Sequence, residues 1–340
     1  MALRWGIVSA GKISHDFAAA LKTHPTEKHQ ITAVAARSYA SAKEFANNHG
    51  IEKAYEGYES LAKDPNVDVA YIGVLNPQHL PVAKLLLDHG KHVLCEKPLT
   101  INKKETKELI EYAKQKKLFL MEAIWSRCFP VYDELRKIIE AGTIGDVLQV
   151  TVDFGFPLDH VDRVNVLELG GSATLDIGVY VLQFSQYVYR GLSPVSVLPW
   201  GHLNKHGTDD RASAILTYPG GRFSMLSVNT CAQLSNTAVV CGTKGMITIP
   251  TFWCPNTLTI KPTGGSDFSE ETLKFDFPAS SAKYNYNNSV GLSYEAEEVR
   301  KCIQQGLLES PKVSHADSLE LADLMDKLRK AAGTVFPQDG

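Results

Sequence analysis

Several features that direct a chain to a membrane, a metal or a nucleic acid are missing from this sequence. No apolar run approaches the roughly 20 residues that a membrane-spanning helix needs. The six cysteines are scattered without a C-x-x-C pair, which argues against a disulfide scaffold or a zinc site and suits a reducing compartment. A net charge of −3 gives no electrostatic reason to expect a nucleic acid or an anionic membrane as a partner.

The N-terminal residues also lack the pattern of a targeting signal. Residues 1–8 run directly into a strand-like stretch, without the charged and apolar regions of a secretory signal peptide. We therefore expect a cytoplasmic protein. With 340 residues, 44% of them hydrophobic and 21% charged, the composition is typical of a soluble globular chain with room for two domains.

The first part of the chain alternates strand-like and helix-like patterns. Short, continuously apolar runs such as Val67–Val74 and His92–Cys95 are typical of parallel strands that are buried on both faces. Their alternation with amphipathic segments predicts a doubly wound parallel α/β sheet of the Rossmann type. We expect this nucleotide-binding domain over residues 1–125.

The second part of the chain, after Gly145-Asp146, has a different pattern. Strand-like runs follow one another with turn signals between them, and one helix from about Ser172 to Tyr189 interrupts the series. We expect residues 126–340 to form an α+β domain for substrate binding and dimerisation, with a large open, mostly antiparallel sheet. Residues 266–286 look irregular. A broad open sheet needs a cover on its second face, so we expect a homodimer through this sheet.

The turn after the first strand is a reduced form of the dinucleotide fingerprint G-x-G-x-x-G. Residues 9–14 read S-A-G-K-I-S, with Ser9 and Ser14 in place of the first and third glycines. Gly11 keeps the position at which bare backbone approaches a pyrophosphate, and the following helix offers free N–H groups to an anion. We expect Ser9, Gly11, Lys12 and Ile13 to bind a dinucleotide, although an ordinary strand-to-helix turn has the same local pattern.

The end of the second strand indicates which dinucleotide is bound. An NAD-binding domain usually has Asp or Glu here to hold the ribose 2′-hydroxyl, whereas this chain has Arg37-Ser38 and no carboxylate before Glu44. An arginine pairs with a 2′-phosphate, so Arg37 and Ser38 predict NADP(H). The simpler alternative is an exposed arginine on a loop.

Further polar and aromatic residues lie in or just after strands of the same predicted sheet, where open α/β sheets place their ligands. We expect these residues to lie along the cofactor: Tyr71, Asn76, His79, Glu96, Lys97, Trp125 and Arg127. Two simpler roles stay open at this stage. His79 at a helix start equally suits capping or core packing, and Trp125 equally suits the core where the domains join.

Two separated stretches carry the residues with the clearest chemical potential. Lys97 follows a buried strand and precedes Pro98, which stiffens its turn. Asp176 and Tyr180 are four residues apart and lie on one helix face, with Gly178 leaving space between them. An Asp on an apolar helix face needs a partner, and Lys97 would suit it. The alternatives are a surface lysine and a packing tyrosine near an Asp at a favourable helix end.

Together these features resemble the glucose–fructose oxidoreductase / inositol dehydrogenase / rhizopine-catabolism family. The resemblance covers essentially the whole chain and depends most on Glu96-Lys97-Pro98 and on Asp176-x-Gly-x-Tyr180, where most of the family has His in place of Tyr. Further stretches, at residues 1–9, 95–98, 121–125 and 336–339, are similar to a subgroup of the family. That subgroup is the dimeric dihydrodiol dehydrogenases of animals, also described as NADP-dependent D-xylose dehydrogenases.

The resemblance implies an NADP-dependent alcohol oxidation. A trans-1,2-dihydrodiol of an aromatic hydrocarbon would become a catechol, and D-xylose would become D-xylono-1,5-lactone. Tyr180 would act as general base in oxidation and general acid in reduction. The ammonium of Lys97 would lower the pKa of the phenol from its ordinary value near ~10, and Asp176 would orient the pair. No metal is implied.

Other residues complete the expected site. The cofactor-binding set also includes Asp176 and Val179. On the substrate side we expect these residues: Trp125, Phe154, Phe156, His160 and Tyr180, with Arg163 as a weaker candidate. Two alternatives stay open. One is another enzyme, either a different NADP-dependent sugar or polyol dehydrogenase of the same family or a biliverdin-reductase-like enzyme. The other is a non-catalytic NADP-binding regulator.

Overall fold

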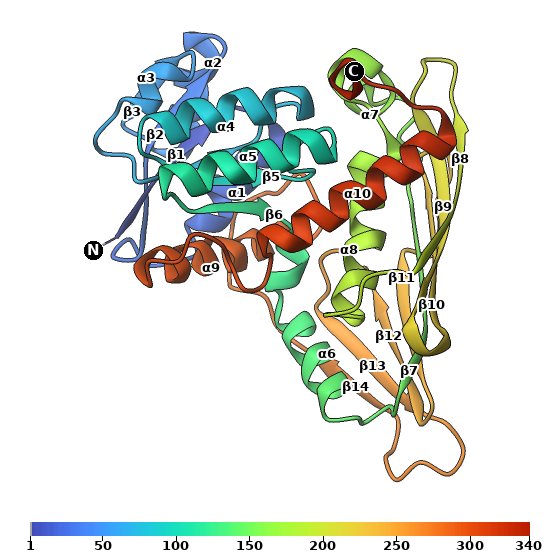
Figure 1. Ribbon diagram of the computed structural model, residues 1–340. Helices are drawn as coiled ribbons and strands as arrows, with labels where there is room; N and C mark the ends of the chain where they lie inside the picture. Colours follow the sequence, from blue (N-terminus) through green and yellow to red (C-terminus); the bar gives the residue numbers. More distant parts are fainter. Residues whose placement is uncertain (1) are drawn as a thin grey trace. The chain divides into compact units, whose positions relative to one another are not determined.

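The computed structural model describes residues 2–340, which form two compact units (Figure 1). The first unit runs to Trp125 and resumes over Phe277–Leu319. The second unit comprises Ser126–Asp276 and Glu320–Gly340. The predicted boundary after residue 125 therefore coincides with the first change of unit, whereas Phe277–Leu319 packs with the unit that contains the N-terminal residues.

The first unit is built on a six-stranded parallel sheet in the order β3-β2-β1-β4-β5-β6. Its strands are β1 Leu3–Val8, β2 His29–Ala36, β3 Lys53–Glu56, β4 Val69–Ile72, β5 His92–Glu96 and β6 Leu120–Ala123. This order confirms the predicted Rossmann-type sheet, whose strand order reverses between β1 and β4. Ligands of such sheets bind beyond the carboxyl ends of the strands at that reversal.

Helices connect these strands, and local sequence explains where several of them begin and end. The helices of the first unit are α1 Lys12–Leu21, α2 Tyr39–His49, α3 Glu59–Ala62, α4 His79–Asp88, α5 Lys103–Lys116 and α9 Leu292–Gln304. Ser38 Oγ accepts a hydrogen bond from the N–H of Ser41, which caps α2, and Asn102 caps α5 in the same way through Glu105. α2 ends at Gly50, which adopts a left-handed conformation.

The segment Phe277–Leu319 belongs to the first unit because it covers α1. The buried carboxylate of Asp16 on α1 accepts hydrogen bonds from the backbone N–H groups of Asn285 and Tyr286 at 2.8 and 3.0 Å. α9 lies beside α1 (Figure 1) and buries a stripe of its residues. The sequence pattern predicts this segment as part of the second domain, because a polar anchor such as Asp16 leaves no periodic signal.

The second unit contains an eight-stranded sheet in the order β14-β13-β12-β11-β7-β10-β9-β8. Its strands are β7 Val147–Gly155, β8 Ser196–Leu203, β9 Asp209–Tyr218, β10 Arg222–Asn229, β11 Thr237–Gly242, β12 Gly245–Pro250, β13 Thr257–Pro262 and β14 Glu271–Lys274. Only the β7–β10 pair is parallel among these strands, which confirms the mostly antiparallel sheet. The irregular conformation predicted for residues 266–286 is wrong in part, because β14 adds an edge strand there.

Helices of the second unit include α6 Pro130–Glu140, α7 Asp162–Asn165 and α8 Val179–Val188, and α8 packs on β7 and β10. A π-helical segment, Thr174–Gly178, leads directly into α8. α10 His315–Ala332 begins in the first unit and continues in the second. A short turn, η7 Pro337–Asp339, follows it, and Arg329 of α10 bonds to Asp339 at 3.0 Å.

The opposite face of the eight-stranded sheet carries exposed apolar side chains. Leu198 of β8 pairs with Ile215 of β9, which pairs with Met225 of β10, so the three side chains form one row across the sheet. They are 61%, 39% and 45% exposed, and Trp200 on the same face is 55% exposed. A row of this kind is typical of a surface that is covered by another protein.

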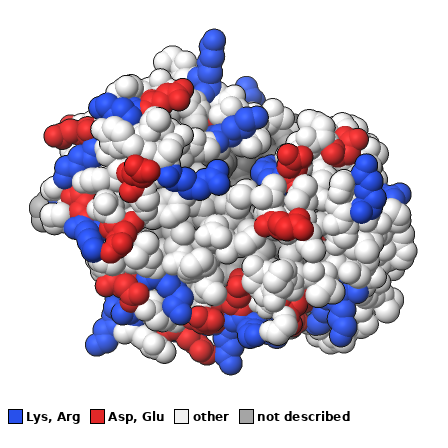
Figure 2. All heavy atoms as spheres, turned by 90° about the horizontal axis from the view of Figure 1, so that it is seen from above, with Lys and Arg blue, Asp and Glu red and all other residues white. Residues whose placement is uncertain are grey.

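Charge is spread without an obvious concentration of one sign on the face drawn in Figure 2, where basic and acidic side chains alternate. This agrees with the net charge of −3. Within residues 2–340, no helix combines the length and apolar character that a bilayer crossing requires.

Candidate active site

The turn after β1 keeps one glycine of the dinucleotide fingerprint, Gly11, and has Ser9 in place of the first. Ser9 directly follows β1 and adopts a positive φ of 96°, a conformation that glycine adopts without strain. Gly11 then precedes α1, with extended backbone and no side chain to cap the free N–H groups of the helix. Both residues lie at the end of β1 that faces the reversal between β1 and β4.

The contacts of the protein itself do not require glycine at position 11. A Cβ atom built on Gly11 would lie 3.5 Å from Ser9 Oγ and 3.9 Å from the carbonyl oxygen of Gly73, which are ordinary contacts. Its φ of −82° is also open to any residue. The chain alone would therefore accept alanine here. A phosphate lying against the open N-terminus of α1 would not, because it needs bare backbone at that point.

The residues predicted to read the adenosine ribose lie beyond the end of β2. Arg37 directly follows β2 and is exposed, and its positive charge acts on the phenol of Tyr58. Burial raises the pKa of Tyr58, and the charge of Arg37 opposes part of that rise. Ser38 is engaged as the cap of α2, and Lys12 begins α1 with an exposed side chain. Arg37 and Lys12 thus present cations at the same edge of the sheet as Gly11.

A buried carboxylate organises the turn that carries Lys97. The hydroxyl of Tyr71 donates to Glu96 Oε1 at 2.5 Å, and the backbone N–H of Lys97 lies 3.3 Å from Glu96 Oε2. Tyr71 is fully buried, and its ring stacks on Phe17 at a centroid distance of 3.9 Å. Tyr71 therefore supports Glu96 from within the core; its contact with a cofactor stays a prediction.

His79 and Glu122 fix the residues after Lys97, whose peptide bond to Pro98 is cis. His79 is fully buried, and its two ring nitrogens face the carbonyl oxygens of Pro98 at 2.8 Å and Val74 at 3.2 Å. Burial lowers the pKa of His79, and the carbonyl oxygens at its two nitrogens oppose part of that shift. Glu122 Oε1 accepts the N–H of Leu99 at 2.9 Å.

The remaining cofactor candidates differ in their surroundings. Asn76 begins the short turn η1 Asn76–Gln78 and is partly exposed, whereas Trp125, at the start of η2 Trp125–Cys128, is buried. Arg127 is buried among glutamines: its guanidinium donates to Gln183 Oε1 at 3.1 Å and to Gln186 Oε1 at 2.5 Å. These contacts give Arg127 a structural role in the second unit, and its role at a phosphate stays a prediction.

The helix predicted to carry Asp176 and Tyr180 is present but begins with a wider turn. Thr174–Gly178 is π-helical, with the N–H of Val179 bonded to the carbonyl oxygen of Thr174, and α8 continues from Val179. Such π segments are rare and frequently occur at functional sites. Asp176 and Tyr180 are both buried, and both belong to the second unit, whereas Lys97 belongs to the first.

Asp176 has an arginine partner, Arg163, that no sequence pattern predicts. Arg163 Nη1 donates to Asp176 Oδ1 at 2.5 Å, from a side chain that is 42% exposed, to a carboxylate that is 12% exposed. The interaction of Lys97 with Asp176 stays a prediction. Neighbouring His160 lies on the surface with its Nδ1 3.7 Å from Asp159, and its role on the substrate side stays a prediction.

Tyr180 lies against a cluster of aromatic rings. Phe154 is edge-on to Tyr180 at a centroid distance of 5.7 Å, and it also contacts Phe156 at 5.4 Å and Trp253 at 4.5 Å. Phe154 and Phe156 are predicted here from the sequence, whereas Trp253 is not. Trp253 follows β12 in a turn that has no periodic pattern, so only its residue type, large and aromatic, was a signal.

One group of residues brings metal-type donors together in the described part of the chain, namely His24, His29 and Glu297. Trp5 Nε1–H donates to His29 Nδ1, so the hydrogen of this ring is on Nε2, which donates to Glu297 at 3.1 Å. Arg300 donates to both oxygens of Glu297 at 2.7 Å. Burial lowers the pKa of His29 to about 4, so the ring is neutral, and its Nε2–H bonded to Glu297 has no lone pair for a metal.

Comparison with protein families identifies both parts of the chain. Residues 3–124 match the family model described as "Oxidoreductase family, NAD-binding Rossmann fold". Residues 132–248 match the one described as "GFO/IDH/MocA C-terminal domain".

Curated relatives match along the full chain. The trans-1,2-dihydrobenzene-1,2-diol dehydrogenase of Xenopus tropicalis is 46% identical over 338 residues, which are 99% of this chain and 100% of the relative. The human protein of the same name is 45% identical over 340 residues, with 100% and 99% coverage.

Solved structures of similar fold include a levoglucosan dehydrogenase in complex with NADH and levoglucosan, with a TM-score of 0.85, 21% identity and coverage of 98% of this chain and 97% of the other. KijD10, a 3-ketoreductase from Actinomadura kijaniata in complex with NADP and TDP-benzene, has a TM-score of 0.82 and 24% identity, with 99% coverage of each chain. At these identities the likeness establishes the fold.

Proposed function

Because the chain belongs to the GFO/IDH/MocA family of oxidoreductases, we propose that it is an NADP-dependent dehydrogenase that oxidises trans-1,2-dihydrodiols of aromatic hydrocarbons to catechols. Membership confirms the family expected from the sequence, and with it an enzyme that has a nicotinamide-dinucleotide-binding domain. The observation that carries the substrate proposal is the phenol of Tyr180 set edge-on to Phe154 within an aromatic cluster. The names of the full-length relatives support the same substrate class.

The proposed reaction removes a hydride from one hydroxyl-bearing carbon and a proton from the hydroxyl group on that carbon. When bound, NADP+ accepts the hydride from that carbon at its nicotinamide ring. The hydroxyl proton goes to a base on the protein, the C–O bond becomes a carbonyl, and the resulting ketone tautomerises to the catechol. With D-xylose the same step at the anomeric carbon would give D-xylono-1,5-lactone.

We assign the proton transfer to Tyr180. A phenol has an ordinary pKa near ~10 and needs help to act as a base at neutral pH. We propose that the ammonium of Lys97 favours the phenolate and that Asp176, held by Arg163 at 2.5 Å, orients the hydroxyl-bearing groups. Glu96 supports Lys97 by accepting its backbone N–H at 3.3 Å.

The aromatic cluster supports a planar, apolar substrate. Phe154, Phe156 and Trp253 present ring faces and edges within 6 Å of one another in centroid distance. A flat diene ring packs favourably against such edges. A sugar presents fewer apolar faces, so oxidation of D-xylose, or of another sugar or polyol, is the second candidate. This second candidate is supported by the vicinal hydroxyl groups that dihydrodiols and sugars share.

We propose NADP(H) over NAD(H) on the basis of the exposed Arg37 after β2. A guanidinium at this point suits a 2′-phosphate, and residues 37–43 contain no carboxylate to hold a 2′-hydroxyl.

We also propose a homodimer through the eight-stranded sheet. The row Leu198, Ile215 and Met225, together with Trp200, is a candidate for the centre of the contact. Leu198→Asp combined with Ile215→Lys should convert the dimer to monomer in sedimentation velocity. The matched pair Val335→Asp and Leu307→Lys changes exposed apolar side chains elsewhere and should leave the mass unchanged.

We also propose that the protein is cytoplasmic. All six cysteines are free thiols, which suits a reducing compartment. Cell fractionation with an antibody to the chain would test it.

The deciding experiment titrates purified protein with NADPH by fluorescence and then follows NADP+ reduction with trans-benzene dihydrodiol and D-xylose in parallel. Turnover of the dihydrodiol with the higher kcat/KM supports the proposal, and a higher value for D-xylose favours the second candidate. NADPH binding without turnover of either substrate would favour a non-catalytic NADP-binding protein.

A further inference from the structure

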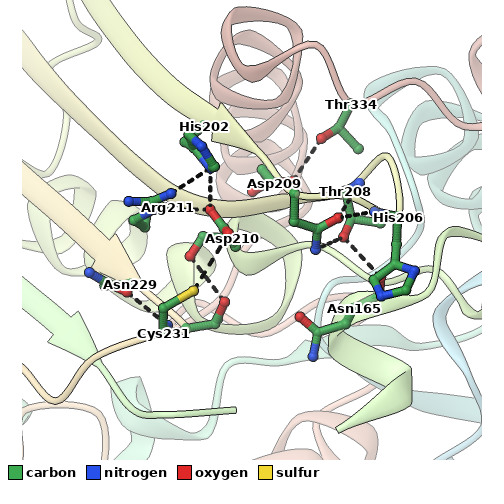
Figure 3. Close-up of polar contacts among 12 residues, drawn as sticks. Asn165, His202, His206, Thr208, Asp209, Asp210, Arg211, Asn229, Cys231 and Thr334 are labelled. Atoms are coloured by element: carbon green, nitrogen blue, oxygen red, sulfur yellow. Dashed lines mark hydrogen bonds and ion pairs between the residues drawn. The ribbon is translucent and has the colours of Figure 1, made fainter. Parts of the chain in front are cut away.

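Asp209 holds the first turn of the helix that carries Asp176 and Tyr180. Its Oδ2 accepts the backbone N–H of Thr174 at 2.7 Å and the hydroxyl of the same residue at 2.6 Å. Its Oδ1 accepts the hydroxyl of Thr334 at 3.1 Å, a contact that Figure 3 shows. Asp209 is 1% exposed, so water does not compete for these bonds.

These bonds tie together three separate parts of the second unit. Asp209 is the first residue of β9, Thr174 begins the π-helical segment, and Thr334 follows α10 near the end of the chain. Thr174 is fully buried and Thr334 is 2% exposed. A negative charge at the N-terminal end of a helix is favourable because the free N–H groups there carry partial positive charge.

The start of the helix depends on the bond to Asp209 because few other acceptors reach its free backbone N–H groups. Ser172 Oγ accepts the N–H of Leu175 at 3.1 Å, which leaves the N–H of Thr174 to Asp209. Asp176 lies two residues after Thr174, within the same wide turn. A shift of about 1 Å in that turn would move the carboxylate of Asp176 and the phenol of Tyr180 with it, and misplacement on that scale lowers turnover by about 100-fold in enzymes.

We propose that Asp209 is a positioning residue for the dehydrogenase reaction: it fixes the π-helical start of the Asp176–Tyr180 helix to the sheet and to the C-terminal segment. This inference rests on the proposed function for its catalytic part. Asp209 does not itself take part in proton transfer, and its effect passes through the placement of Asp176 and Tyr180.

The neighbouring residue provides a matched control. Asp210 is also a buried carboxylate on β9, but its bonds go to His202 at 2.8 Å and to Arg211 at 3.1 Å rather than to the helix (Figure 3). Asp209→Asn and Asp210→Asn therefore remove the same charge from adjacent buried positions, of which only Asp209 bonds to the helix.

The first experiment compares turnover of trans-benzene dihydrodiol. Asp209→Asn should lower kcat by about 10- to 100-fold and leave the Kd for NADPH within about twofold of wild type. Asp210→Asn should keep kcat within about threefold of wild type. Thr174→Val, which loses the hydroxyl donor but keeps the N–H, should fall between Asp209→Asn and wild type, and Thr174→Ser should restore kcat. Equal kcat values for the two Asn variants would overturn the proposal.

A second measurement does not depend on activity. In hydrogen exchange followed by mass spectrometry, peptides covering residues 172–182 should lose protection in Asp209→Asn and keep it in Asp210→Asn. Unchanged protection would refute the anchoring role even if kcat fell. If the wild type oxidises no dihydrodiol, the proposed function fails, and this exchange experiment still decides the structural role of Asp209. Should Asp209→Asn not fold, Thr334→Val removes one bond only and should show a partial loss of protection.

Discussion

Arg163 and Asp176 form an ion pair in which one partner faces solvent and the other does not: the guanidinium is 42% exposed and the carboxylate 12%. The pair joins α7 to the π-helical segment. Arg163 lies on a different element, α7, and its exposed side chain can change conformation. Asp176, by contrast, has its position set by the backbone around it.

Arg163→Leu should therefore impair catalysis more than folding. The substitution removes a charge-assisted bond to Asp176 and leaves its carboxylate freer to turn, so we expect kcat/KM for the dihydrodiol to fall by about 10-fold. Thermal melting should shift little, because an exposed partner contributes at most about 1 kcal/mol. Arg163→Lys keeps the charge without the planar guanidinium, so its kcat/KM should lie between those of Arg163→Leu and wild type. A kcat/KM for Arg163→Leu equal to that of wild type would contradict this role.

Tyr180→Phe should separate binding from turnover. The ring stays within the aromatic cluster, while the hydroxyl that we assign to proton transfer is lost, so kcat should fall at least ~100-fold. NADPH binding measured by fluorescence should stay close to wild type. Tyr187→Phe on the same helix removes a hydroxyl that donates to the carbonyl oxygen of Tyr132, and it should keep turnover within about threefold. Near-normal turnover in Tyr180→Phe would move the proton transfer to Lys97.

Gly11→Ala tests the cofactor turn. A methyl group fits the protein at this position but blocks close approach of a phosphate, so the melting temperature should stay unchanged while the Kd for NADPH rises about 10-fold or more. Gly171→Ala is the contrasting variant, because its Cβ would lie 2.7 Å from backbone atoms of Val166. It should lower the melting temperature instead. A loss of stability in Gly11→Ala would show that the glycine serves the fold.

Arg37→Asp should change the choice of cofactor. A carboxylate at the end of β2 repels a 2′-phosphate and suits a free 2′-hydroxyl, so the KM for NADP+ should rise far more than that for NAD+. Arg37→Gln, which removes the charge without adding a negative one, should raise the KM for NADP+ to a smaller extent. Equal effects on both cofactors would show that Arg37 does not read the 2′-phosphate.

Two acidic residues of α9 should give opposite responses of stability to pH. Glu295 is fully buried, and within the described residues neither of its carboxyl oxygens has a hydrogen-bond partner; burial and the charge of Glu96 raise its pKa well above the usual range. The bonds from Arg300 and His29 lower the pKa of Glu297 to about 2.

The folded state therefore binds an extra proton at Glu295 above the ordinary carboxyl pKa, so wild-type stability falls as the pH rises through that region. Glu295→Gln should melt higher than wild type at pH 8, and this difference should vanish toward pH 4. Glu297→Gln should melt lower than wild type at pH 7, with the difference disappearing as the pH falls toward 2. Parallel pH curves for both variants and wild type would contradict these assignments.

Sequence patterns predicted those parts of the structure that depend on local or periodic features of the chain. Continuous apolar runs predicted the parallel strands, and the spacing of Asp176 and Tyr180 predicted one helix for both. What the sequence could not reveal depends on contacts between distant residues. The bond from the N–H of Asn285 to Asp16 and the place of Trp253 beside Phe154 join segments that are far apart in the chain, and the pairing of Arg163 with Asp176 joins two separate elements.

The chain changes unit three times, after Trp125, after Asp276 and after Leu319. Neither unit is therefore a continuous stretch that could be excised from the gene as a module. A fragment ending at residue 125 would lack the segment that covers α1 and would leave Asp16 without the N–H groups that it binds. A ribosome must release residues up to about Leu319 before the nucleotide-binding unit can be completed, so this unit matures late in synthesis although its sequence begins first.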